Sequence, residues 1–457
     1  MKTSRRALGA LLLLCAALLM RPAIAWAHAH LKKSEPATGS TLSMPPHAIR
    51  LWFSEKPDPS LTTVILSDSA GTPFATGAPS PDAEGPLAVS IPIRDVLGAG
   101  LYTVTWTTAG SDGHPSKGHF TFRITGAPAA AAPVTTPVMP HVALDTSIKA
   151  APQDIAASAV TPAYVIARAI SLAAMLAMMG AVAFRVGVLP RVPGLSATTE
   201  IATADRIATI SIAIAVVYVL SAMARLYLQS RMISGGFFDA DHLRTMGMAT
   251  EWGSTWRPQF GAGVVACVGF VLVRGRGLPA WGVVGSVMLT LAAVTAGSGH
   301  AWSSPRMPAV AVMVDMFHIM GAAGWMGSLL WMAAVGLPII QSSRDNRARR
   351  AAALVQAFSP LALVFAAVVG ISGVASAWLR LGVLDALWST AYGQVLLVKL
   401  VLLAALAAMG FHNWRHLSPS LGTEEGTARL QRSAAIEVGI GLLVVIVTAV
   451  LVATPTP

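Results

Sequence analysis

The sequence predicts an all-β soluble domain followed by an all-α, polytopic membrane domain of about eight transmembrane helices. The 457 residues are 54% apolar and only 12% charged, with a mean hydropathy of +0.63, which is too apolar for an ordinary soluble protein. Short runs that alternate polar and apolar residues occupy the N-terminal part of the chain, and this pattern indicates strands. Long apolar segments then recur to the C-terminus, as expected for membrane spans.

Residues 1–27 have the composition of an export signal. A basic start precedes an apolar run over residues 7–20, and Ala25-Trp26-Ala27 is a small-x-small cleavage site. Cleavage there makes His28 the first residue of the mature chain. We therefore expect the following domain to lie outside the cytoplasm; the alternative is an uncleaved signal anchor.

Residues 28–126 are expected to form one strand-rich domain. Alternating runs are separated by turns rich in Pro and Gly, a spacing typical of a β-sandwich or barrel. The predicted strands are 49–53, 63–66, 87–91, 101–106 and 119–124. Residues 127–158 are rich in Ala, Pro and Thr without periodicity, which predicts an extended linker.

Residues 159–457 are expected to form the membrane domain, embedded in a lipid bilayer. An even number of spans places the C-terminus on the same side as the N-terminal domain. Most loop arginines fall on the predicted cytoplasmic side, and Arg380 is one of the few assigned outside. The net charge of +11 therefore indicates membrane orientation and not a nucleic-acid partner. The predicted spans are 162–189, 207–228, 259–273, 281–299, 309–340, 354–379, 392–414 and 434–453.

The mature N-terminus is a candidate Cu(II) site. The α-amine and imidazole of His28 form a chelate, and a second imidazole completes a nitrogen set that Cu(II) favours. Asp112 and His114 are two apart, so they share a face of an extended segment, and Asp112 could ligate axially or orient a ligand. A rival geometry uses His30 as the third residue of an unblocked start, with the amine and two deprotonated amides. The alternative without metal is a frayed polar end and a simple turn.

Ionisable residues inside the predicted spans form a second candidate site, because such residues are costly in a bilayer. Arg168, Asp315, His318 and Lys399 fall in the outer third of their spans. Asp315 and His318 are three apart and so share one helix face. The alternative is that the three charged residues only neutralise one another.

A copper entrance site is predicted at the outer mouth. His300 precedes the fifth span by a short loop and could bind copper together with His318. Met316 and Met320 are nearby in sequence, and thioethers are soft Cu(I) ligands. The alternative is that these methionines only fill gaps between helices.

At the inner end, His412 and Glu437 could form an exit site or a proton relay. An interfacial anchor is the alternative interpretation of this segment. The two cysteines, Cys15 and Cys267, lie in separate apolar stretches and cannot supply a disulfide framework or a CxxC site.

The soluble half resembles the periplasmic copper-resistance protein C family (CopC). The resemblance rests on His28-Ala-His-Leu, Leu51-Trp-Phe-Ser-Glu55 and Ser111-Asp-Gly-His114-Pro. It covers nearly all of residues 28–125. The resemblance implies a Greek-key β-barrel and a Cu(II) site at His28, Asp112 and His114.

The helical half resembles the copper-resistance protein D family (CopD). The span count, Gly299-His-Ala-Trp302 and Asp315-Met-Phe-His318 followed by Gly324-Trp-Met-Gly carry this resemblance. It covers about 160–453 and implies copper handling across the bacterial inner membrane, commonly described as uptake.

These features together predict copper binding outside the cell membrane and copper import, contributing to copper homeostasis or resistance. If the membrane path carries Cu(I), a periplasmic copper donor or a cellular reductant is needed, since the chain has no haem, flavin or paired-thiol motif. The alternative is a sequestration and delivery module for a cuproenzyme, with the spans as a dock. An enzyme is not expected: the strand domain is small, and Asp112 would fill the position that an oxygen-activating copper keeps open. ATP-driven pumping is not expected either, because no lysine lies in a GK[ST] loop.

Overall fold

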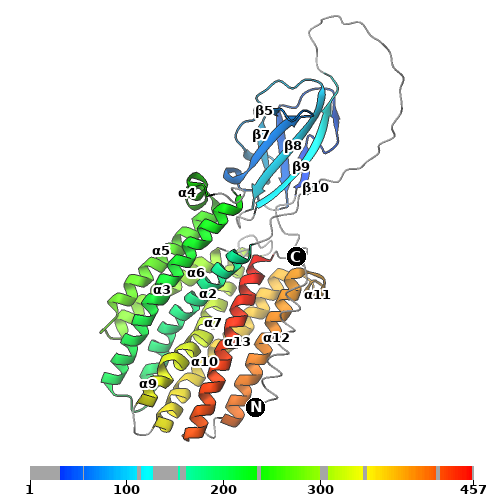
Figure 1. The fold of residues 1–457 in the computed structure, drawn as a ribbon. Coiled ribbons are helices and arrows are strands. Elements are labelled where there is room, and N and C mark those ends of the chain that lie inside the picture. Colours follow the sequence, from blue (N-terminus) through cyan, green and yellow to red (C-terminus); the bar gives the residue numbers. More distant parts are fainter. Residues whose placement is uncertain are drawn as a thin grey trace, which may run out of the picture. The chain divides into compact units, whose positions relative to one another are not determined.

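The structure is a computed structural model that describes residues 31–54, 56–110, 115–126, 153–154, 161–233, 238–298, 307–342, 347–417 and 422–454. The described residues divide into two compact units, and each is treated by itself. The first contains the strands together with helix α4 (Ala240–Met248). The second contains the other helices (Figure 1).

The strands of the first unit form two sheets. One has the order β1-β3-β7-β6, and the other has the order β10-β9-β8-β4-β5, with β2 added parallel to β9. Each of the five strands predicted from the sequence is present. The bounds are β1 Leu31–Glu35, β2 Thr41–Leu42, β3 Ala48–Phe53, β4 Thr63–Asp68, β5 Pro73–Phe74, β6 Ser80–Asp82, β7 Gly85–Pro92, β8 Gly100–Ala109, β9 Pro115–Ile124 and β10 Gln153–Asp154.

Alternation along the strands produces the core of this unit. In β3 every second residue, from Ile49 to Phe53, is buried, because successive side chains point to opposite faces of a sheet. Phe53 of the first sheet meets Trp106 of the second edge-on, with ring centroids 5.2 Å apart. A Cβ on Gly118, the cross-strand partner of Trp106, would lie 2.6 Å from the indole ring. The expected β-sandwich is therefore confirmed.

The second unit is a bundle of long helices with short 3₁₀ and π turns. Its elements are α2 Pro162–Ala183, η2 Phe184–Val188, η3 Leu189–Arg191, α3 Ala197–Ile233, α5 Glu251–Leu272, α6 Leu278–Gly297, α7 Pro308–Ala322, η4 Ala323–Gly327, α8 Ser328–Trp331, η5 Met332–Gly336, α9 Leu337–Ser342, α10 Arg347–Leu381, α11 Ala386–Ser389, α12 Ala391–His412, η6 Asn413–Leu417 and α13 Glu424–Ala453.

The predicted number of spans needs a correction. Within the described residues, seven helices are long and apolar enough to cross a membrane, not eight. The difference is α5, the third predicted span, whose first turns include Glu251, Arg257 and Pro258. This helix still packs in the bundle, since Trp256 Nε1 donates to the Ala222 carbonyl of α3 at 3.0 Å. The end of α13 lies at the same end of the bundle as the start of α2 (Figure 1).

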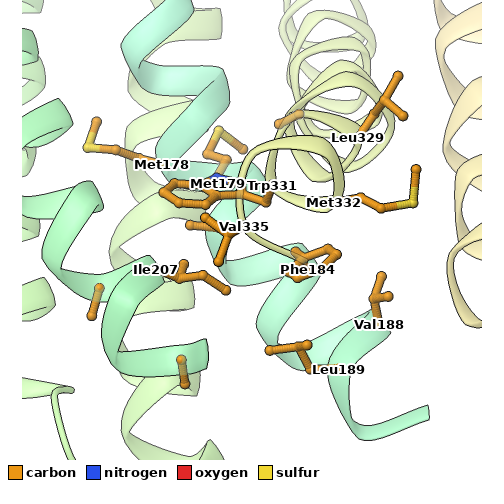
Figure 2. Close-up of a cluster of buried hydrophobic side chains, with 14 of the residues drawn as sticks. Met178, Met179, Phe184, Val188, Leu189, Ile207, Leu329, Trp331, Met332 and Val335 are labelled. Carbon is orange, nitrogen blue, oxygen red and sulfur yellow. The ribbon is translucent and has the colours of Figure 1, made fainter. Parts of the chain in front are cut away.

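The contact between α2 and the segment that contains α8 is part of the main core of the bundle. Trp331 is 2% exposed, and its indole N–H donates to the Ala177 carbonyl at 2.7 Å. Figure 2 shows Trp331 next to Met178 and Met179, with Phe184 and other apolar side chains completing the cluster. Because this hydrogen bond of the Trp331 indole lies within an apolar core, it fixes the distance between α2 and α8.

Four π-helical turns interrupt the described spanning segments. They are η2, η4, η5 and η6. A π turn closes its hydrogen bond over one residue more than an α turn, and such turns frequently occur at functional sites. A 3.6-residue repeat that is continued through one of these turns therefore predicts the wrong helix face for the residues that follow it.

A close helix contact gives a first testable prediction. A Cβ on Gly327 of η4 would lie 2.8 Å from the Gly180 Cα of α2. We expect Gly327→Ala to lower the free energy of unfolding by about 1–3 kcal/mol, because the backbones must separate. Gly370→Ala in α10 is the matched control, since its Cβ would meet nothing within 4 Å. Thermal unfolding in detergent measures both; equal stability of the two variants would contradict the contact.

Candidate functional site

A polar cluster joins three spanning helices near the end of the bundle that carries α11 (Figure 1). Its first layer is built around Asp315 of α7, whose carboxylate forms an ion pair with Arg380 of α10. Ser376 Oγ donates to Asp315 Oδ1 at 2.9 Å, and Arg380 Nη1 donates to Ser376 Oγ at 2.8 Å. Tyr392 of α12 is a further hydrogen-bonding partner of Arg380. The opposite charges of Asp315 and Arg380 compensate each other in this layer.

The second layer lies one turn further along α7 and contains His318. Its Nδ1 is 3.1 Å from Ser372 Oγ of α10, and the Ser372 hydroxyl donates to the Val368 carbonyl. Because that hydroxyl proton is already used, Nδ1 is the donor in the His318–Ser372 bond. In this tautomer the lone pair of His318 lies on Nε2, the ring atom that can bind a metal ion.

Lys399 of α12 completes this second layer. It follows Tyr392 by seven residues and so lies two turns along the same helix face. Its ammonium is within electrostatic range of His318, Asp315 and Arg380. The structure therefore brings together Asp315, His318 and Lys399.

Arg380 is the main residue that the sequence analysis missed. The sequence predicts Arg380 in an outer loop, whereas it lies in the last turn of α10 and pairs with Asp315. The sequence offers Arg168 and Lys399 as the positive charges that neutralise Asp315. In the structure the ion-pair partner of Asp315 is Arg380. The signal that could have found it is the spacing of Ser372, Ser376 and Arg380, which are four residues apart and share one face.

Met316 and Met320 lie on a different face of α7. Both pack against the main hydrophobic core. Residues two apart on an α-helix point in nearly opposite directions, so these thioethers point away from His318. The structure thus places the two methionines in the core and does not group them with the His318 ring.

A second polar group lies at the other end of α12. Glu437 of α13 accepts a hydrogen bond from Asn413 Nδ2 at the start of η6. Ser433 Oγ donates to Asn413 Oδ1 at 2.9 Å. His412 is exposed, and its ring stacks on His416 with centroids 4.6 Å apart. Glu437 is therefore joined to Asn413 and Ser433, while His412 stacks on His416.

The remaining predicted ligands fall outside the described residues. These are His28 and His30 before β1, Asp112 and His114 between β8 and β9, and His300 before α7. Within the part of the chain that is described, no three His, Cys, Asp or Glu side chains are grouped so that they could hold a metal ion.

Three protein families match separate parts of the chain. The family described as CopC domain matches residues 31–125. The family described as Copper resistance protein D-like, N-terminal domain matches residues 157–305. The family described as Copper resistance protein D matches residues 352–451. The matches follow the division into a strand unit and a helical unit.

Two similar proteins differ in how much of the chain they cover. The Copper transport protein CutJ of Bacillus subtilis (strain 168) is 26% identical over 455 residues, which are 96% of this chain and 76% of that protein. Protein YobA of Escherichia coli (strain K12) is 31% identical over 124 residues, which are 27% of this chain and 99% of that protein.

Solved structures match the strand unit. A crystal structure of PcoC, a methionine-rich copper resistance protein from Escherichia coli, is 33% identical and covers 22% of this chain and all of that chain, with a TM-score of 0.20. The crystal structure of CopC from Methylosinus trichosporium OB3b is 22% identical and covers 22% of this chain and 95% of that chain, with a TM-score of 0.21.

Proposed function

We propose that this chain, which belongs to the fused copper-resistance protein C and protein D family, binds copper in its strand domain and imports it through its helical domain. Membership of the family establishes copper handling by a multi-pass membrane protein. The relatives are named for copper transport and resistance and not for a catalysed reaction. The import step is our proposal.

The capture step is proposed for the mature N-terminus. His28, through its amine and ring, binds Cu(II) together with His114 and Asp112, with His30 as the rival ligand. This set has the nitrogen donors that Cu(II) favours. The strand domain acts outside the membrane, and the linker over residues 127–158 keeps it at a high effective concentration near the bundle.

The observation that carries the transport proposal is the two-layer polar cluster. Placing Asp315, Arg380 and Lys399 within spanning helices is costly, and such residues commonly mark an ion pathway. The neighbouring His318 offers the lone pair of Nε2 to a metal ion. We infer that copper passes from His300 to His318 and then toward Asn413 and Glu437, with His412 at the exit.

The proposed direction is inward. The arginine-rich loops between spans favour an orientation with the N-terminal domain and the C-terminus outside the cytoplasm of a bacterial cell. Copper captured outside then reaches the polar cluster first and the Glu437 group second. A periplasmic donor or reductant supplies Cu(I) to the membrane path.

Copper uptake into vesicles of known orientation tests this function. We expect His318→Ala in the full-length protein to lower the uptake rate at least tenfold, because the ring nitrogen that receives the metal is lost. His242→Ala is the matched control, since His242 is exposed in α4 and pairs with Asp239 at 2.6 Å.

The results separate two functions. Uptake that is lost in His318→Ala and kept in His242→Ala supports a transporter with an intramembrane site. Absence of uptake by the wild type with either Cu(I) or Cu(II), while the strand domain still binds copper, would replace transport by sequestration and delivery to a cuproenzyme.

A further inference from the structure

Glu437 is a carboxylate whose charge is not compensated within the described residues. Its hydrogen-bonding partners, Asn413 and Ser433, are neutral, whereas Asp315 pairs with Arg380. Glu437 is half-buried, and a carboxylate inside a membrane domain is stabilised by a proton or a cation. Glu437 is thus available to balance the charge of a bound metal ion.

Met409 lies on α12, one helical turn from the residue that bonds to Glu437. It precedes Asn413 by four residues and so lies one turn away on the same face of α12. Helices α12 and α13 run antiparallel (Figure 1), and Asn413 faces Glu437. Met409 is therefore opposite Gly441, one turn from Glu437 on α13.

Met326 reaches the same position from the π turn η4. A Cβ on Gly441 would collide with the Met326 methyl group and would lie 3.7 Å from its sulfur. The thioether thus occupies the space that the glycine leaves open. Met326 and Met409 also pack against the same hydrophobic cluster, which Leu406 and Ile440 help to form.

We propose that Met326, Met409 and Glu437 form a Cu(I) site between η4, α12 and α13. Two thioethers provide the soft ligands that Cu(I) prefers, and the carboxylate supplies the compensating negative charge. The site lies beyond His318 in the direction of Asn413, so it fits a second station for copper. This inference rests on the proposed function and specifies the oxidation state that the membrane path carries.

Other methionines of the bundle provide the control. Met178 and Met332 belong to the main core, where Figure 2 shows them among apolar side chains and near Trp331. Both are at most 2% exposed. A Cu(I) ion there would have thioethers but no carboxylate within that cluster, so we assign these methionines to packing.

Cu(I) titration of the purified full-length protein, in competition with a chromophoric chelator and without oxygen, tests the site. We expect Met326→Leu/Met409→Leu to bind one Cu(I) equivalent fewer than the wild type. Met178→Leu/Met332→Leu is expected to bind as many as the wild type, with a similar unfolding temperature. Met44, in the strand domain, is present in all of these proteins and cancels in the comparison.

Two further variants test the geometry. Glu437→Gln is expected to weaken this Cu(I) equivalent at least tenfold, because the compensating charge is lost. Gly441→Ala is expected to weaken it by displacing Met326, without removing any ligand. X-ray absorption should show fewer sulfur neighbours of copper in the Met326→Leu/Met409→Leu protein than in the wild type.

The outcomes separate the site from transport. Equal Cu(I) stoichiometry and affinity in the wild type and in Met326→Leu/Met409→Leu would overturn the site, even if the wild type takes up copper into vesicles. Loss of one Cu(I) equivalent in Met326→Leu/Met409→Leu, but not in Met178→Leu/Met332→Leu, supports the site. If the wild type then shows no copper uptake, the site stands and the transport proposal fails.

Discussion

Asp315→Asn is expected to abolish copper uptake and to lower the free energy of unfolding by about 1–3 kcal/mol. The substitution leaves the partly buried Arg380 guanidinium without its carboxylate. It also weakens the link through Ser376, whose hydroxyl donates to Asp315 and accepts from Arg380. Denaturant unfolding in detergent and uptake into vesicles measure the two effects.

Two variants make this result specific. Asp241→Asn changes an exposed carboxylate of α4 and is expected to keep both stability and uptake. Asp315→Asn/Arg380→Gln removes both charges, so it should be more stable than Asp315→Asn alone. Stability of Asp315→Asn within about 0.5 kcal/mol of the Asp241→Asn protein would contradict a structurally important ion pair.

His114→Ala is expected to weaken Cu(II) binding by well over tenfold, because it removes one of the nitrogen donors proposed for the mature N-terminus. Copper titration of the mature full-length protein measures the affinity, and electron paramagnetic resonance reports the nitrogen ligands. His30→Ala should then have little effect.

The rival geometry predicts the reverse. If His30 wraps the metal with the amine and two amides, His30→Ala should reduce the affinity strongly and His114→Ala only slightly. Both geometries need a free amine at His28, so mass spectrometry of the exported protein should find cleavage after Ala27. His119→Ala, in β9, is a suitable control because no motif assigns it to the metal site.

The fold could be predicted wherever apolar residues repeat with a single period along the sequence. Strand β3 alternates strictly from Ile49 to Phe53, and the period of two gives its faces directly. Helix α5 was less predictable, because Glu251 and Arg257 in its first turns lower the hydropathy of a segment that still packs in the bundle. Residues 1–27 as a signal and 127–158 as a linker stay predictions.

Only the ionisable residues of the candidate site could be predicted from the sequence. Asp315, His318 and Lys399 stand out because ionisable residues are rare in spans. Arg380 lies in the last turn of α10, where an arginine is also typical of a loop boundary, so its pairing could not be inferred. Ser372 is uncharged and gives no signal in a single sequence, although it sets the tautomer of His318.

Sequence distance was a poor guide to the methionines. Met316 and Met320 are close to His318 in sequence, but each is two residues from it on the regular helix α7 and so faces the core. Met326 lies further along the chain, within η4, where the helix repeat changes. Extrapolating a 3.6-residue period from His318 through such a turn misplaces the side chains that follow.

The same turns affect how related chains should be aligned. Each π turn holds one residue more than an α turn, so evolution can delete a residue at Met332–Gly336 and convert the turn to regular α-helix. In a homologue with such a gap, the helix on each side of the turn would still present the same faces to its neighbours. A one-residue gap inside α12 would instead rotate every later side chain of that helix by about 100° about the helix axis. Single-residue gaps in an alignment of this family are therefore expected to concentrate at the four π turns.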